Sequence, residues 1–202
     1  MRTVGKKFGE DSRVKIPALM HFTRLGYRYR SLKEIRPYLD FETNINKDAL
    51  RAALERINEL DEALTDEELK SIVTKLSDSL TGEDLGRAFF QKLRKGVECR
   101  GESLQLIDYD YICGNDFEVV TELPCLVDAN TEVGSFRPDI TVFINGLPLA
   151  FCEVKIPNNR KGMKAEYDRM NERTENAKYR RFLNITQMML FSNNMEYDDT
   201  GN

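Results

Sequence analysis

The segment that most constrains this chain is DITVFINGLPLAFCEVK, residues 139–155, in which two strand-forming runs flank an Asn-Gly pair. An Asn-Gly pair between alternating apolar runs is a strong short-range signal for a β-hairpin. We therefore expect two adjacent antiparallel strands here, and the remaining elements must pack around them.

The alternation of side chains along these strands decides which residues share a face. Asp139 lies on the opposite face of its strand from Ile140, and Glu153 and Lys155 lie on the opposite face of theirs from Cys152. Charged side chains are therefore expected on one face of each strand, and apolar side chains on the other.

The turn must bring those faces into agreement. A two-residue Asn145-Gly146 turn in a regular ladder would place Asp139 opposite Cys152 and mix charged with apolar positions. A three-residue loop ending at Leu147 would instead place Asp139 opposite Glu153, with their Cβ atoms about 5 Å apart. The apolar pattern therefore predicts an odd register of this kind, or a bulge near the turn.

Two carboxylates on neighbouring strands repel one another unless a proton, a cation or Lys155 compensates their charge. A simple Glu153–Lys155 surface ion pair is one interpretation of the pattern. Hard oxygen ligands also suit Mg²⁺ or Mn²⁺, which keep several waters and bind substrate phosphates. Such a site beside a lysine is suited to the hydrolysis of phosphodiester bonds.

The composition bounds the class of protein. With 202 residues, 41% hydrophobic and 32% charged, the chain is typical of a soluble globular protein with a core of normal size. A net charge of −4 excludes a basic nucleic-acid coat but not a local basic face. The start has no apolar stretch and the four cysteines include no CxxC pair, which favours a cytoplasmic protein with buried, reduced thiols and no membrane partner.

The order of elements predicts the fold class. Asn46 and Thr65 are expected to cap two helices, and Thr81 to open a third helix with Leu85 and Phe89 inward. Further helices are expected at 10–26 and 163–177, and strands at 103–109, 116–127, 139–145 and 148–156. This order predicts an α/β or α+β fold with a mixed central sheet flanked by helices. We expect one domain, residues 1–202, with a helical insertion at about 45–97 and a sheet core at about 101–158.

The string RPDITVFINGLPLAFCEVK, residues 137–155, resembles the amino-terminal PD-(D/E)xK nuclease region of the R (restriction, motor) subunit of type I restriction enzymes. Pro138-Asp139 and Glu153-Val154-Lys155 form the signature, with thirteen residues between Asp139 and Glu153. The segments EDSRVKIPALMHFTRLGYRY, FFQKLRKGVE, IDYDYICGNDFEVV and QMMLFSNN fit as well, so the resemblance covers most of the chain. It implies a restriction-endonuclease-like fold.

The resemblance also implies roles for single residues. Asp139 and Glu153 would bind the metal ion together with the Val154 carbonyl, and Lys155 would orient or activate the attacking water. Such nucleases often add a glutamate from the first core helix, for which Glu10 is the candidate and Glu83 the competing one.

Contacts with DNA are the least defined part of this interpretation. Candidates are the basic residues Arg160, Lys161 and Lys164, and a second basic cluster comprises Arg24, Arg28 and Arg30. Many members of the family carry a Gln-x-x-x-Tyr element after the Glu-x-Lys strand. This chain lacks it there, and only Gln187, four residues before Phe191, has a similar spacing.

The resemblance implies an endonuclease that depends on Mg²⁺ or Mn²⁺ and cuts double-stranded DNA, with methyltransferase and specificity subunits as partners. The sequence has no GxxxxGK[ST] phosphate loop, so ATP would serve only ATPase and translocase domains missing from this chain. Without those domains, this chain is expected to cut DNA weakly or not at all by itself. The alternatives are another nuclease of the same superfamily, from repair or recombination, and a non-catalytic DNA-binding or docking module.

Overall fold

A computed structural model describes residues 14–125, 136–155 and 160–192, without the side chains of 160–163. Its helices, with the short 3-10 turns marked η, are α1 (Ile16–Arg24), α2 (Leu32–Ile35), η2 (Arg36–Tyr38), α3 (Lys47–Ile57), α4 (Asp66–Asp78), α5 (Arg87–Lys95), η3 (Ile112–Gly114), α6 (Arg160–Glu175), η5 (Ala177–Tyr179) and α7 (Arg180–Ile185). Its strands are β1 (Arg28–Tyr29), β2 (Val97–Cys99), β3 (Glu102–Leu104), β4 (Phe117–Thr121), β5 (Ile140–Ile144), β6 (Leu147–Val154) and β7 (Met188–Ser192).

Five of these strands form a mixed sheet in the order β1-β4-β5-β6-β7. The strands β4, β5 and β6 are antiparallel neighbours, while β1 and β7 pair in parallel at the two edges. The fold is therefore of the predicted α/β class. The sheet extends beyond the expected range 101–158, because both edge strands come from outside it.

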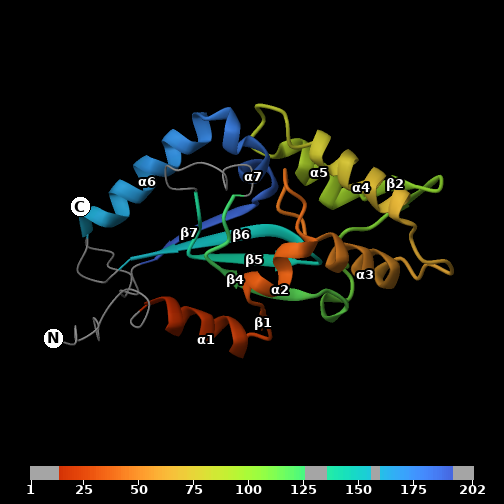
Figure 1. Cartoon of the computed structure of the whole chain (residues 1–202), viewed down its shortest axis with the longest axis horizontal. Helices are drawn as coiled ribbons and strands as arrows, with labels where there is room; N and C mark the ends of the chain where they lie inside the picture. Colours follow the sequence, from red (N-terminus) through yellow and green to blue (C-terminus); the bar gives the residue numbers. More distant parts are fainter. Residues whose placement is uncertain (1–13, 126–135, 156–159, 193–202) are drawn as a thin grey trace.

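Helices cover both faces of this sheet. Helix α1 packs on one face, where Phe22 joins a cluster with Ile140. Helices α6 and α7 lie on the other side (Figure 1), where Met170 joins a cluster with Phe143 and Phe151. The face that carries Asp139 was expected to be polar, but it is apolar over most of its length because helices bury it. Its charged side chains are confined to one end.

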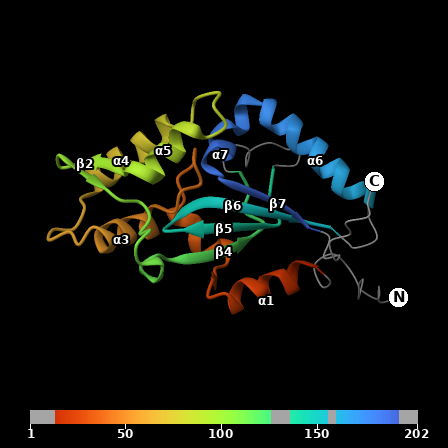
Figure 2. The ribbon, with the colours of Figure 1, turned by 180° about the vertical axis from the view of Figure 1, so that it is seen from behind.

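The middle third forms a helical unit beyond the other end of the sheet, as Figure 2 shows from behind. Asn46 caps α3 and the Thr65–Glu68 capping box starts α4, as their spacing predicts. The third helix differs from the prediction, since α5 begins at Arg87 rather than near Thr81, and Leu85 is 88% exposed. The reason is local. The Asp84 carboxylate accepts hydrogen bonds from the Gly86 and Ala88 N–H groups and holds the chain just before α5 in a turn.

The β5–β6 turn connects this helical unit to the sheet. It has two residues rather than three, because Ile144 pairs with Leu147 and both Asn145 and Gly146 have positive φ, 53° and 77°. A Cβ on Gly146 would lie 2.5 Å from the Asn46 carbonyl oxygen, so only glycine permits this approach.

The predicted irregularity is a bulge. The register shifts between Val142 and Phe143, which leaves Leu149 without a partner on β5. Leu147 and Leu149 are both buried in the core of the helical unit. The bulge therefore turns an extra apolar side chain toward α3 and α4, and it restores the register that sets Ile140 opposite Cys152.

Two expectations from composition can be compared with the structure. Over the described ranges, no helix combines the length and the apolar character needed to cross a membrane. Cys99, Cys125 and Cys152 are buried, whereas Cys113 is exposed, contrary to the expectation of buried thiols. Cys113 lies in a surface turn, η3, where no core is available to cover it.

Candidate functional site at the end of strands β5 and β6

Asp139 and Glu153 come together where β5 begins and β6 ends. Ile140 pairs with Cys152, so the next residues outward, Asp139 and Glu153, share the opposite face. The two carboxyl groups interact, because burial, the charge of Asp139 and a hydrogen bond between them all raise the pKa of Glu153. Both residues are buried, with exposed fractions of 9% and 6%.

The Asp139 carboxylate ends the ladder between the two strands. Its Oδ2 atom accepts a hydrogen bond of 2.9 Å from the Val154 N–H, which would otherwise lack a partner at the strand end. Its Oδ1 atom lies 3.2 Å from Nζ of Lys15, which comes from the segment that leads into α1. The sheet backbone therefore holds the position of this carboxylate.

Glu153 carries the strongest electrostatic perturbation at this site. Burial, followed by the negative charges of Asp139 and Glu166, raises its pKa to about 8, and the positive charge of Lys155 opposes that rise. The Lys155 ammonium is 3.9 Å from the nearer Glu153 oxygen, too far for a strong hydrogen bond. Without a cation, this end of the sheet therefore disfavours a second negative charge, and Glu153 keeps its proton near neutral pH.

Among the residues that the structure describes, three carboxylates surround the Lys155 ammonium. It donates a hydrogen bond of 3.0 Å to the Val154 carbonyl oxygen, and it is 4.0 Å from Asp139, 3.9 Å from Glu153 and 3.6 Å from Glu166. Its backbone N–H donates to the Ser192 carbonyl oxygen, which ties the end of β6 to β7. The side chain is 15% exposed, so solvent can still reach the ammonium.

Lys15 and Glu122 lie beside Asp139 and come from outside the hairpin. Lys15 forms an ion pair with Glu122, which follows β4, in addition to its contact with Asp139. Arg137 pairs with the other oxygen of Glu122 at 2.8 Å. Neither Lys15 nor Glu122 carries a sequence signal. Lys15 reaches Asp139 through the packing of α1 on the sheet, and Glu122 through the pairing of β4 with β5.

The donor atoms at this site fit a divalent cation of the magnesium type. Within the part of the chain that the structure covers, no cluster of three or more His, Cys, Asp or Glu side chains could hold a metal ion. Two carboxylates and one carbonyl are nevertheless a typical protein contribution for Mg²⁺, which keeps water as its other ligands. Thr141 Oγ1, one step along the same face of β5, is buried without a hydrogen-bond partner among the described residues, a second sign of incomplete compensation.

The remaining candidates lie elsewhere or outside the described residues. Glu10 and the side chains of Arg160 and Lys161 fall outside them, and Lys164 is exposed on α6. The Gln187 amide donates to the last carbonyls of α7, and the register places Phe191, not Gln187, beside Glu153. The side-chain amide of Gln187 therefore caps the end of α7.

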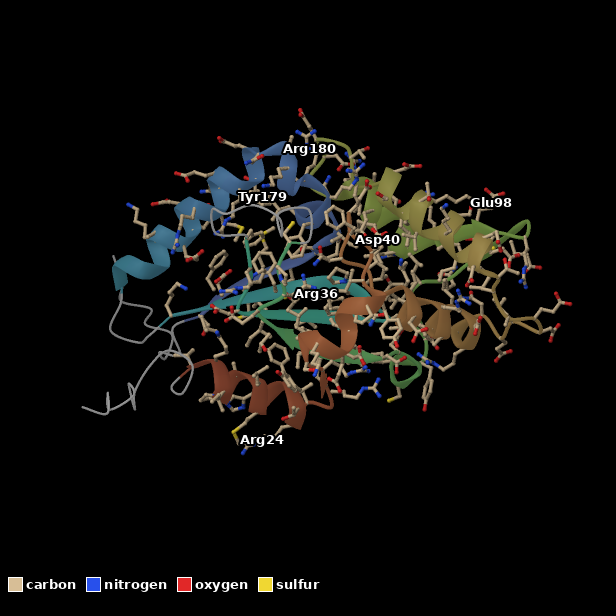
Figure 3. The ribbon with its side chains drawn as sticks, viewed as in Figure 1. Arg24, Arg36, Asp40, Glu98, Tyr179 and Arg180 are labelled. Carbon is tan, nitrogen blue, oxygen red and sulfur yellow. The ribbon has the colours of Figure 1, made fainter. Side chains whose placement is uncertain are left out.

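The competing glutamate and the second basic cluster also lie apart from this site. Glu83 precedes α5 and pairs with Arg180. Figure 3 shows Arg24 at the end of α1, on the opposite side of the sheet from Arg180. Arg28 and Arg30 both contact the buried carboxylate of Glu118, at 2.9 and 3.1 Å. Two of the three arginines therefore have a partner within the fold.

Comparison with known proteins gives a consistent result. A family profile described as "Type I restriction enzyme R protein N terminus" matches residues 7–198. A protein of Methanocaldococcus jannaschii named "Putative type I restriction enzyme MjaIXP endonuclease subunit" is 29% identical over 210 residues, which cover 97% of this chain and 20% of that protein.

A second relative is the Haemophilus influenzae protein named "Type I restriction enzyme HindI endonuclease subunit". It is 29% identical over 161 residues, which cover 69% of this chain and 14% of that protein. The chain thus spans a fifth or less of the curated relatives that it matches.

Proposed function

The chain belongs to the family of type I restriction enzyme R protein N termini, and on this premise we propose that it is a metal-dependent endonuclease domain that hydrolyses phosphodiester bonds of double-stranded DNA. The observation that carries the proposal is the convergence of the buried Asp139 and Glu153 carboxyl groups beside the Lys155 ammonium. Buried carboxyl groups that are hard to ionise together without a cation support a site that binds one.

Each residue has a distinct task in this proposal. Asp139, Glu153 and the Val154 carbonyl supply the oxygen donors that hold Mg²⁺ or Mn²⁺. When bound, the ion neutralises negative charge on the scissile phosphate. Lys155 holds the attacking water by donating a hydrogen bond to it, and its exposed side is the route by which DNA approaches. The hairpin register fixes these groups on rigid strands, which favours a reactive geometry.

The wider assembly is part of the proposal. Methyltransferase and specificity subunits would choose the DNA site, and an ATP-driven motor in the remainder of the R subunit would present the DNA. The support is the family membership and the names of the two relatives, of which this chain matches 20% and 14%.

The proposal is tested by replacing Asp139, Glu153 or Lys155 with alanine in a reconstituted restriction complex. We expect each variant to lose DNA cleavage while the complex retains its ATPase activity. Glu98→Ala is the matched control, because Glu98 is exposed in β2 at the far end of the molecule (Figure 3). Undiminished cleavage by the three variants would refute the assignment.

A further inference from the structure

Helix α6 carries a buried carboxylate that faces the candidate site. Glu166 is only 3% exposed, which is rare for a glutamate on a helix with mostly charged side chains. Met170, one turn later on the same helical face, is buried in the cluster that contains Phe151. The face of α6 that covers the sheet (Figure 1) therefore points Glu166 at the ends of β5 and β6.

The contacts of Glu166 divide between the helix and the site. Its Oε2 atom lies 3.6 Å from the Lys155 ammonium and also contacts Arg169, while its Oε1 atom lies 3.5 Å from Arg173. Of the three carboxylates around Lys155, Glu166 is the nearest, and it is the one that the hairpin does not supply.

The two arginines suit Glu166 to a role other than metal binding. Their guanidinium groups pair with both carboxylate oxygens, which makes Glu166 a poor competitor for a cation. Arg173 is itself fixed over the Phe136 ring, 4.2 Å from its centroid, and Phe136 packs edge-on against Phe151 of β6. The carboxylate is therefore held at a fixed place relative to the strand that carries Lys155.

The contact between Glu166 and Lys155 would matter most when a metal ion is bound. Once Asp139 and Glu153 engage a divalent ion, they no longer neutralise Lys155, and the ion repels the ammonium. We propose that Glu166 is a positioning residue that keeps Lys155 in its reactive place when the metal ion is bound. The inference rests on the proposed nuclease function and adds a residue to it.

The test compares Glu166→Gln with Glu172→Gln, a matched change at an exposed position of the same helix. In the reconstituted complex we expect Glu166→Gln to slow cleavage by about 10- to 100-fold, the loss typical of a misplaced reactive group, and Glu172→Gln to have no effect. Mn²⁺ affinity should be unchanged in both variants. Glu166→Asp, which keeps the charge, should restore part of the rate.

A spectroscopic measurement on this chain separates positioning from a purely structural role. The side-chain ¹³Cε and ¹⁵Nζ resonances of Lys155, assigned by their loss in Lys155→Met, should shift in Glu166→Gln with Mg²⁺ present and stay in place in Glu172→Gln. If Glu166→Gln fails to fold, Glu166→Asp carries the same test, with a smaller shift and a smaller loss of rate expected.

The outcomes distinguish this inference from the function on which it rests. Normal cleavage by Glu166→Gln with unmoved Lys155 resonances, while Lys155→Ala is inactive, would overturn the inference alone. Loss of Mn²⁺ binding in Glu166→Gln would also overturn it, because Glu166 would then be a ligand. Cleavage that survives Asp139→Ala, Glu153→Ala and Lys155→Ala would instead overturn the nuclease assignment.

Discussion

Strands β4 and β6 each carry a buried glutamate, and the two glutamates differ in the charged groups around them. Glu118 on β4 is 4% exposed and has Arg28 and Arg30 at 2.9 and 3.1 Å, supplied by the neighbouring edge strand and the residue after it. Glu153 on β6 is 6% exposed, with Lys155 at 3.9 Å and a second carboxyl group against it. The fold neutralises the first carboxylate with two guanidinium groups, whereas it raises the pKa of the second to about 8.

The difference separates a structural ion pair from a binding site. A buried carboxylate with two guanidinium partners holds β1 and the segment after it against β4. At Glu153, by contrast, a second carboxyl group lies close and the Lys155 ammonium is 3.9 Å away. Such a buried carboxyl pair lowers the stability of the metal-free protein, which supports the proposed cation site. Four changes test this contrast, and they are ordered by the size of the expected effect.

Manganese should stabilise the protein only through the Glu153 end of the sheet. At 100 times its Kd, Mn²⁺ should raise the free energy of unfolding by about 2.7 kcal/mol, measured by urea denaturation with Mn²⁺ and again after chelation with EDTA. Glu153→Gln should abolish the gain, and Glu118→Gln should retain it. Equal stabilisation of both variants would remove the proposed distinction.

Loss of the Glu118 charge should destabilise the β1–β4 edge. Glu118→Gln should lower the free energy of unfolding by about 2 kcal/mol, below the usual range for a broken buried pair, because Arg28 is largely exposed and can be hydrated. Urea denaturation measures the change, with Glu98→Gln on β2 as the exposed control. A change no larger than that of the control would show that the pair contributes nothing.

The pH dependence of the metal-free protein should report Glu153. Its pKa is raised from 4.5 to about 8 in the fold, so its contribution to stability is full below pH 4.5 and is lost as the pH rises through 8. Glu153→Gln should flatten this decline and stabilise the protein at high pH by on the order of 1 kcal/mol. Thermal unfolding from pH 5 to 9 without metal measures it, and a parallel decline in the variant would contradict the assignment.

The smallest effect is expected at Lys15. Its ammonium lies 3.2 Å from Asp139 Oδ1 and competes with a metal ion for that oxygen. Lys15→Met should therefore tighten Mn²⁺ binding by only about threefold, about 0.6 kcal/mol, because the ammonium divides its charge between Asp139 and Glu122. Calorimetric titration measures the affinity, with Lys164→Met as an exposed control. Weaker binding by Lys15→Met would contradict the proposed competition.

The sequence predicts the elements whose signals are local. The caps at Asn46 and Thr65 form as expected because each needs only a side chain and the backbone three residues away. The start of the third helix was wrong at Thr81, since Asp84 competes for the same backbone groups and Leu85 adopts a positive φ of 54°. Where Thr81 and Asp84 can both cap a helix, the sequence alone does not predict at which of them the helix begins.

The site is predictable where it depends on one hairpin. Alternation along two strands predicts that Asp139 and Glu153 share a face, and the bulge at Leu149 gives the register that this requires. The turn length was wrong because Asn145 and Gly146 both accept positive φ, and the core of the helical unit takes up the extra leucine. The contacts of Lys15 and Glu166 depend on tertiary packing of α1 and α6, which no local pattern specifies.

The hydrogen bond from the Val154 amide to the Asp139 side chain would report whether the proposed cation site is occupied. A ligand that draws the Asp139 carboxylate outward would weaken this hydrogen bond, so the Val154 amide proton would exchange with deuterated solvent faster. The Val142 amide, in the middle of the neighbouring strand, serves as an internal standard. One peptide group would thus report a cation bound at the proposed site as a change in its hydrogen–deuterium exchange rate.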